Sequence, residues 1–148
     1  MHHHLILRIV SKFLIPPILL YALYVQFHGD FGPGGGFQAG VIFAVGFILY
    51  GLVYGVSHLR RVLPPSLVRA LTALGVLIYA GTGVVSMFLG FDYLDYNAFA
   101  SDPAHPSHGQ HLGIIIIEFG VGLTVFAVMT AIFMAFASRA PEIKDTDW

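Results

Sequence analysis

The chain has 148 residues, of which 57% are hydrophobic and only 10% are charged, and its mean hydropathy is +0.80. Soluble domains carry roughly 25% charged residues, so this chain has too few polar groups to cover its surface in water, and a soluble globular protein is excluded. The formal net charge of −1 provides no overall field for binding nucleic acid, and the lack of cysteine excludes disulfides, thiolate metal sites and thiol nucleophiles.

Three consecutive histidines, His2 to His4, stand at the start of the chain. They fit either a native sequence or the remnant of an affinity tag, so they enter no functional argument. The first apolar segment, residues 5–27, lacks a small-residue cleavage site at its far end, where Gln26 and His28 stand. We therefore expect a retained membrane helix instead of a signal peptide.

Four apolar segments are long enough to cross a membrane. A hydrocarbon core of about 30 Å takes about 20 helical residues, and the sequence predicts helices over residues 5–27, 37–57, 70–91 and 112–138. Helices satisfy every backbone group within the segment, and these runs lack the alternation of barrel strands. The sequence therefore predicts an all-α, single-domain bundle of four transmembrane helices formed by residues 1–148.

The basic residues are expected on one side of the membrane. They stand at the start of the first predicted helix, between the second and the third, or after the fourth: Arg8, Lys12, Arg60, Arg61, Arg69, Arg139 and Lys144. The other two loops, residues 28–36 and 92–111, contain aspartates but no Lys or Arg. Because cytoplasmic loops are enriched in Lys and Arg, we expect both termini in the cytoplasm. The glycine-rich loop and the acidic loop then face outwards, and the acidic loop is expected to form a short lid.

Small residues recur at four-residue spacing along the predicted helices. They form four groups: Gly51 and Gly55; Thr82, Ser86 and Gly90; Gly120 and Thr124; and Ala127, Ala131 and Ala135. Such ridges let helices approach closely in lipid, where no hydrophobic force drives association. They can serve packing within the bundle or docking of partner subunits. Four helices need only part of this surface, which favours docking.

Pro16 and Pro17 lie near the middle of the first predicted helix. Each proline removes a backbone donor and crowds the preceding turn, so we expect a static bend. The alternative is a broken helix whose freed carbonyl groups face an ion.

Glu118 is the only ionisable residue deep in the apolar segments. An acid at the bilayer centre costs at least about 2.5 kcal/mol and is usually functional. Counting about 1.5 Å per residue places it roughly 9 Å below the outer interface, near the depth of Tyr21 and Ser86. It is therefore a candidate carrier of a proton or cation, and the alternative is a neutral acid held by Tyr21 or Ser86. Gly122, one turn away, leaves room for a water or a neighbouring helix.

His105, His108 and His111 are spaced by three in the last loop, and a metal site there is conceivable. Pro106 and Gly109 argue against a helix that would align them, and no carboxylate completes a ligand set. We therefore expect no metal, no cofactor and no catalytic residue. The glycine run 34–36 is not a phosphate loop either, because no Gly-Lys-Ser/Thr follows it.

Two stretches of the sequence resemble the B subunit of Mrp-type multisubunit cation/proton antiporters. HGDFGPGGGFQAGVIFA, residues 28–44, is similar to the signature turn of that family, carried here by Pro33, Gly34, Gly35, Gly36, Phe37 and Gln38. HLGIIIIEFGVGLTVFAVM, residues 111–129, is similar to the family's final helix with its buried Glu. Many members have a second glycine after the glutamine, where this chain has Ala39, so a small residue is kept.

This resemblance implies an accessory subunit of a complex of several different subunits in a prokaryotic plasma membrane, related to the membrane arm of respiratory complex I. Such a complex exchanges Na⁺ or Li⁺ for protons. The implied partners are the other antiporter subunits and membrane lipid, with Na⁺ and H⁺ as the transported ions and no nucleic acid. Glu118 becomes a candidate for the ion path, and no enzymatic activity is expected.

Other functions remain open on the sequence alone. A homologous subunit of a membrane-bound hydrogenase-type complex would share the same motifs. A stand-alone, homo-oligomeric transporter would need a buried charge pair or repeated halves with broken helices, whereas this sequence has one buried acid and no repeat. A membrane enzyme would need a nucleophile, a completed metal set or a cofactor motif.

Overall fold

The computed structural model describes residues 5–29, 32–100 and 107–139. This part of the chain is all-helical, with six elements in the order α1 (Leu5–Gln26), α2 (Gly36–Tyr54), α3 (Val56–Val62), α4 (Pro65–Phe88), the 3-10 helix η1 (Tyr96–Phe99) and α5 (His108–Ala137). Four of these helices have the length and apolar composition of membrane spans. The predicted bundle of four transmembrane helices is confirmed.

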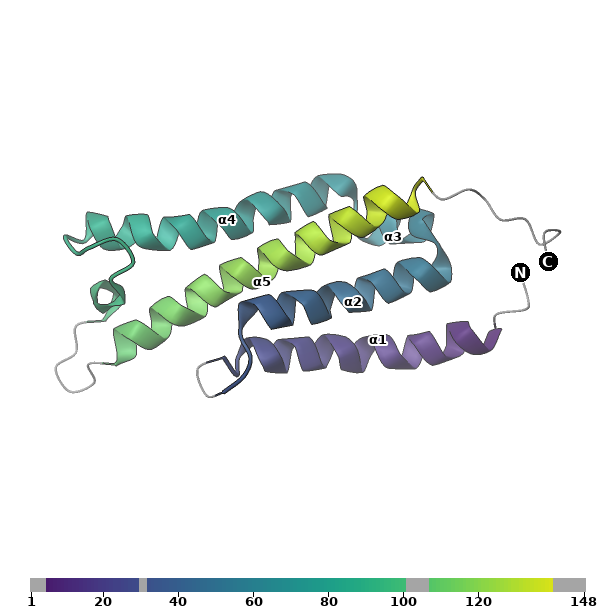
Figure 1. The fold of residues 1–148 in the computed structure, drawn as a ribbon, viewed down its shortest axis with the longest axis horizontal. Coiled ribbons are helices and arrows are strands. Elements are labelled where there is room, and N and C mark those ends of the chain that lie inside the picture. Colours follow the sequence, from purple (N-terminus) through teal and green to yellow (C-terminus); the bar gives the residue numbers. More distant parts are fainter. Residues whose placement is uncertain (1–4, 30–31, 101–106, 140–148) are drawn as a thin grey trace.

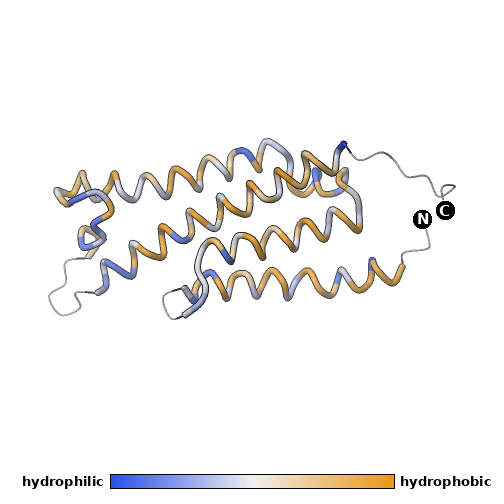
Figure 2. Tube along the Cα trace, in the orientation of Figure 1, coloured by the Kyte–Doolittle hydropathy of each residue, from blue (hydrophilic) through white to orange (hydrophobic). Residues whose placement is uncertain are grey.

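The four long helices lie side by side in the spatial order α1, α2, α5, α4 (Figure 1). The start of α1 and the end of α5 lie at the same end of the bundle as α3, and the hairpin of α4 and α5 extends beyond the turn between α1 and α2 at the other end. Apolar residues cover all four helices along their length (Figure 2). Large side chains such as Ile6, Phe13 and Phe88 are exposed, as a surface in contact with lipid or partner subunits requires.

The second helix ends earlier than predicted, and a short helix follows it. Gly55 has a φ of 95° and ends α2, because that backbone conformation favours glycine. The expected helical pair of Gly51 and Gly55 is therefore wrong. In α3 and the residue after it, Leu59 and Leu63 are buried while Arg60 is exposed. The third long helix begins at Pro65 instead of residue 70, since proline suits the first turn of a helix.

Helix α1 continues through Pro16 and Pro17 without a break. A broken helix with carbonyl groups turned to an ion is not observed in α1. Near its start, the carbonyl group of Arg8 accepts hydrogen bonds from the Ser11 hydroxyl at 3.0 Å and from the Tyr54 hydroxyl at 2.8 Å. The second bond ties the start of α1 to the end of α2.

Small residues bring α4 and α5 into close contact. A Cβ atom on Gly75 would lie 2.7 Å from the carbonyl oxygen of Gly120 and 2.8 Å from the backbone nitrogen of Thr124. The ridge of Gly120 and Thr124 therefore packs against α4 within the chain, and it does not form a docking surface for a partner subunit. Ala127 is buried as well, whereas Ala131 and other members of the predicted ridges remain exposed.

The described part of the acidic loop, residues 92–100, folds against the end of α4 and the start of α5, as expected of a short lid. The ring of Tyr93 covers Gly83, and the ring of Tyr96 covers Gly113. Burial raises the pKa of the Tyr96 phenol, and the phenols of Tyr79 and Tyr93 add to this shift. Tyr96 therefore packs as a neutral ring.

We expect both termini to be cytoplasmic, because the Lys and Arg residues favour the cytoplasmic side. Single cysteines at the exposed residues Asp92 and Arg61 test this in a chain that has no other thiol. An impermeant thiol reagent added to intact cells should label the Asp92→Cys variant and leave Arg61→Cys unlabelled. The opposite labelling pattern would invert the topology.

The Gly75→Ala substitution should destabilise the packing of α4 on α5. The added methyl group meets backbone atoms of α5, and overpacking of this kind costs roughly 1–3 kcal/mol. Gly81→Ala on the same helix is the matched control, because nothing lies within 4 Å of its added Cβ. Thermal unfolding followed by circular dichroism in detergent should show a lower midpoint for Gly75→Ala only. Equal midpoints for the two variants would contradict the contact.

Candidate functional site

The turn between α1 and α2 is closed by one backbone carbonyl group. Val25 accepts the N–H of His28 at 3.3 Å and the N–H of Gly35 at 3.0 Å. Gly35 has a φ of 103°, and a Cβ on Gly34 would lie 2.9 Å from the same carbonyl oxygen. The run of glycines therefore lets the chain fold back over the end of α1 and start α2 at Gly36.

The side chain of Glu118 projects from α5 into this turn. A Cβ on Gly29 would lie 2.5 Å from both carboxylate oxygens, and a Cβ on Gly35 would lie 2.7 Å from Oε1. A Cβ on Gly36 would collide with the main-chain carbonyl group of Glu118. We call Gly29, Gly35 and Gly36 the glycine pocket. It brings together the two motifs that the sequence singled out, which lie about 80 residues apart in the chain.

The glycine pocket lies at the N-terminus of α2, which favours a negative charge. The first N–H groups of a helix lack partners within the helix, and the aligned peptide dipoles give this end a partial positive charge. Gly35, the N-cap residue, has no side chain to occupy the position. A carboxylate there is stabilised by roughly 0.3–1 kcal/mol, and by about 2 kcal/mol when partly buried. This offsets part of the cost of placing Glu118 in an apolar span.

Glu118 lies level with the end of α1 and the start of α2, although it is well inside α5. Ten residues separate it from His108, the first residue of α5, which is about 15 Å of helix. The hairpin of α4 and α5 continues past the turn at this end (Figure 1). The acid is therefore half-buried where the shorter pair of helices stops.

The structure does not bring Tyr21 and Ser86 to the carboxyl group of Glu118. The Ser86 hydroxyl donates to carbonyl groups of its own helix, on Gly83 at 3.0 Å and on Thr82 at 3.2 Å. Tyr21 is 57% exposed, and its ring stacks on Tyr24 with centroids 6.1 Å apart. Among the described residues, neither hydroxyl is hydrogen-bonded to Glu118. Glu118 lies beside Gly29, just past the end of α1, whereas Tyr21 stands eight residues earlier in the chain. The similar depth expected for these two residues is therefore not found.

The room expected beside Gly122 is filled by α2 and by a glutamine of α1. A Cβ on Gly122 would lie 2.5 Å from Oε1 of Gln26 and 3.1 Å from the carbonyl oxygen of Gly36. A Cβ on Gly40 would lie 2.6 Å from the carbonyl oxygen of Gly122. The backbones of α2 and α5 are thus in direct contact for one helical turn below the glycine pocket.

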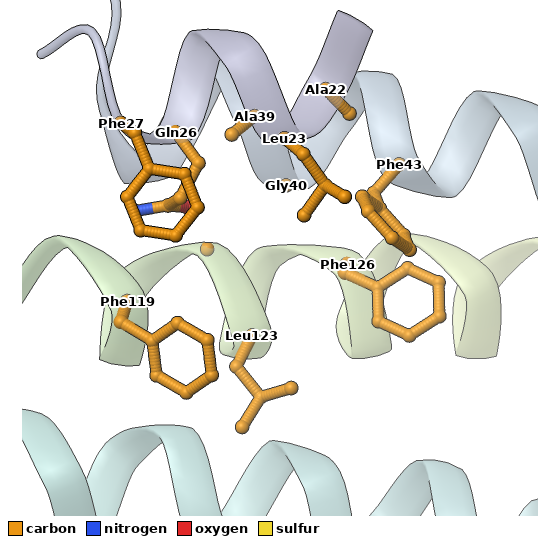
Figure 3. Close-up of a pocket in the computed structure, with 11 residues that line it drawn as sticks. Ala22, Leu23, Gln26, Phe27, Ala39, Gly40, Phe43, Phe119, Leu123 and Phe126 are labelled. Carbon is orange, nitrogen blue, oxygen red and sulfur yellow. The ribbon is translucent and has the colours of Figure 1, made fainter. Parts of the chain in front are cut away.

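A cavity of about 180 Å³ adjoins this contact, between α1, α2 and α5 (Figure 3). Its walls include Phe43, Phe119 and Phe126, and Gln26 is the only lining residue with a polar side chain. An apolar cavity stays dry when it offers a water too few polar partners. The side chains that line this cavity therefore do not provide a path for ions.

The remaining residues singled out by the sequence have separate positions. Pro33, Phe37 and Gln38 are exposed at the start of α2, while His105 lies outside the described residues. Sequence reasoning missed Gly29 as a neighbour of Glu118 and Gln26 as a neighbour of Gly122. Gly29 precedes the glycine run by a few residues. This nearness in the sequence is the feature that could have indicated Gly29 as part of the site.

Comparison with known proteins identifies the family of the chain. Residues 6–131 match a domain related to the MnhB subunit of Na⁺/H⁺ antiporters. This chain belongs to the MnhB family. Proteins of Staphylococcus aureus strains Newman, USA300 and COL, each described as a candidate antiporter subunit, mnhB2, are 31% identical to it over 134 residues, covering 89% of this chain and 93% of theirs.

The match to the MnhB family spans both halves of the site, since the glycine pocket and Glu118 lie within residues 6–131. The predicted resemblance to the B subunit of these antiporters is confirmed. With its four apolar helices, this MnhB-family chain is a multi-pass protein of the prokaryotic plasma membrane.

The Gly36→Ala substitution should separate α2 from α5 in this MnhB-family protein. Its methyl group meets a backbone carbonyl group, which cannot move as a flexible side chain can, so a cost of roughly 1–3 kcal/mol is expected. Gly32→Ala is the matched control in the same turn, because the nearest atom to its added Cβ is 3.7 Å away. Scanning fluorimetry of the detergent-solubilised chain should show a lower transition temperature for Gly36→Ala alone. An unchanged transition would show that α2 and α5 are not in contact here.

Proposed function

We propose that this chain is an accessory subunit of a multisubunit antiporter that exchanges Na⁺, or Li⁺, for H⁺ across the plasma membrane. Membership of the MnhB family supports this proposal, as do relatives described as candidate antiporter subunits. The observation that carries the proposal is the carboxyl group of Glu118 in the glycine pocket at the start of α2.

Two opposing environments act on Glu118. The N-terminus of α2 favours its ionised form, whereas the apolar span of α5 in which it stands favours its neutral form, because burial of a charge in an apolar site is costly. A group between two such environments can change its charge when a neighbouring charge arrives or leaves. In the proposed cycle, the protonated carboxyl group releases its proton to water as a cation approaches, and it regains a proton when that cation departs.

The arrangement of the helices supports a role within a larger assembly. Because the helices lie in the order α1, α2, α5, α4, α1 packs mainly on α2 and α4 packs mainly on α5. Their outer faces carry large exposed apolar side chains, including Ile6 and Phe13 on α1 and Leu77 on α4. Phe37, at the start of α2, is 61% exposed beside the glycine pocket. These faces are suited to contacts with other subunits, and the proposed complex requires such contacts.

The isolated chain should not exchange ions. Among the described residues of its four spans, Glu118 is the one acid, and transporters that act alone need a buried charge pair or repeated halves with broken helices. Liposomes containing only this chain should show no Na⁺-dependent proton movement, measured with an entrapped pH dye. Liposomes containing the complete complex should show it, and a complex lacking this chain should lose it. Robust exchange by the lone chain would establish a stand-alone transporter instead.

Replacing Glu118 distinguishes a carrier from a structural acid. Glu118→Gln keeps the shape but cannot change charge, so the variant should assemble normally and lose most antiport. Glu118→Asp, which is shorter but still ionisable, should keep part of it. The readout is cation-dependent dequenching of a pH dye in vesicles carrying the whole complex. Asp92→Asn, which neutralises an exposed acid outside the spans, is the matched control and should leave exchange unchanged.

Wild-type exchange by a fully assembled Glu118→Gln complex would overturn the proposed role, because the charge of the acid would then be dispensable. In that case Glu118 would serve as a neutral hydrogen-bonding group that fixes α5 against the turn. Whether the chain is a subunit of the complex is measured separately, by testing whether it assembles with the other subunits in the same vesicles.

A further inference from the structure

A second cavity, of about 240 Å³, lies at the opposite end of the bundle from Glu118. It is bounded by α3, α4 and α5, and its walls include Arg60, Val68, Arg69, Ala131, Met134 and Ala135. We call it the arginine pocket. Two arginines, Arg60 and Arg69, contribute to its wall, and the other lining residues are apolar.

The positive charge of the arginine pocket is not balanced by a nearby acid in the described part of the chain. Within residues 5–29, 32–100 and 107–139, the acids are Asp92, Asp95 and Glu118, and all of them lie towards the other end. The N-terminus of α4 also borders the pocket at Pro65. Its N-cap residue provides no side-chain hydrogen bond, so the free N–H groups of the first turn add to the positive potential.

The arginine pocket lies where two apolar spans end, because α3 joins the end of α2 to the start of α4, and we therefore expect it at the boundary between water and lipid. Leu59 and Leu63 are buried against the bundle, and they anchor the short segment that carries the exposed Arg60. On α5, Ala131 and Ala135 are exposed on a span that is otherwise apolar. The cavity therefore has a cationic mouth at the membrane surface and an apolar wall that continues into the membrane.

We propose that the arginine pocket binds the phosphate headgroup of an anionic phospholipid, whose acyl chain lies along Ala131 and Ala135. Guanidinium groups form paired, charge-assisted hydrogen bonds with phosphate oxygens. Basic pockets between transmembrane helices on the cytoplasmic side are suited to acidic lipid headgroups. The short alanine side chains leave space for an acyl chain beside α5. This inference does not depend on the proposed antiport.

The test is a lipid titration of the full-length chain in mild detergent, followed by native mass spectrometry. The probes are phosphatidylglycerol and phosphatidylcholine with identical acyl chains. Arg60→Gln/Arg69→Gln removes both charges of the pocket, and Arg61→Gln/Arg139→Gln removes two charges from the same end outside the pocket. Each basic residue near an anionic surface strengthens attachment roughly fivefold. The pocket variant should therefore retain phosphatidylglycerol roughly 30-fold more weakly than wild type, and the matched control should lose clearly less.

Three results would overturn the inference. Equal losses in the two double variants would indicate diffuse attraction by charge, and equal retention of the two lipids by wild type would exclude headgroup recognition. The third concerns the acidic end of the chain, Glu142, Asp145 and Asp147, as a competing occupant. Changing these three to Gln, Asn and Asn should leave phosphatidylglycerol retention unchanged, and a marked increase would assign the pocket to that segment. Circular dichroism of each variant checks that the helices are intact.

Discussion

The close approach of α5 to the start of α2 is the contact on which the rest of the site depends. Gly36 lies against the main-chain carbonyl group of Glu118, and Gly40 lies against that of Gly122. On each helix the second contact lies one helical turn from the first, so the backbones of α2 and α5 stay together over that turn. Any side chain at Gly36 would push the helices apart and withdraw the carboxyl group from the turn between α1 and α2.

In lipid, such glycine contacts determine how the helices pack. In water, burial of large apolar side chains brings helices together, but lipid is as apolar as leucine and provides no such force. Shape and backbone proximity must then determine the arrangement. The same principle acts between α4 and α5, where Gly75 meets Gly120 and Thr124. These contacts set the relative heights of the helices, and the heights place Glu118 at the N-terminus of α2.

The sequence predicted the four spans and the family, and it singled out the turn from Pro33 to Gln38 and Glu118, which the structure brings together. These features depend on hydropathy and on local motifs, which can be recognised directly in a sequence. The depth of Glu118 relative to Tyr21 and Ser86 could not be predicted in this way. Counting from the ends of the spans assumes that all helices end at the same height, whereas the hairpin of α4 and α5 extends further than α1 and α2 (Figure 1). The break at Gly55 was missed because the apolar run continues through it.

In the proposed cycle, Glu118 changes its charge in the glycine pocket during transport. Infrared difference spectroscopy of the reconstituted complex tests this directly, by recording the spectrum before and after addition of Na⁺. In the wild-type complex a protonated carboxyl band should decrease and a carboxylate band should increase, and both changes should be missing in the Glu118→Gln complex. Difference spectra that are the same for the wild-type and Glu118→Gln complexes would contradict this change of charge.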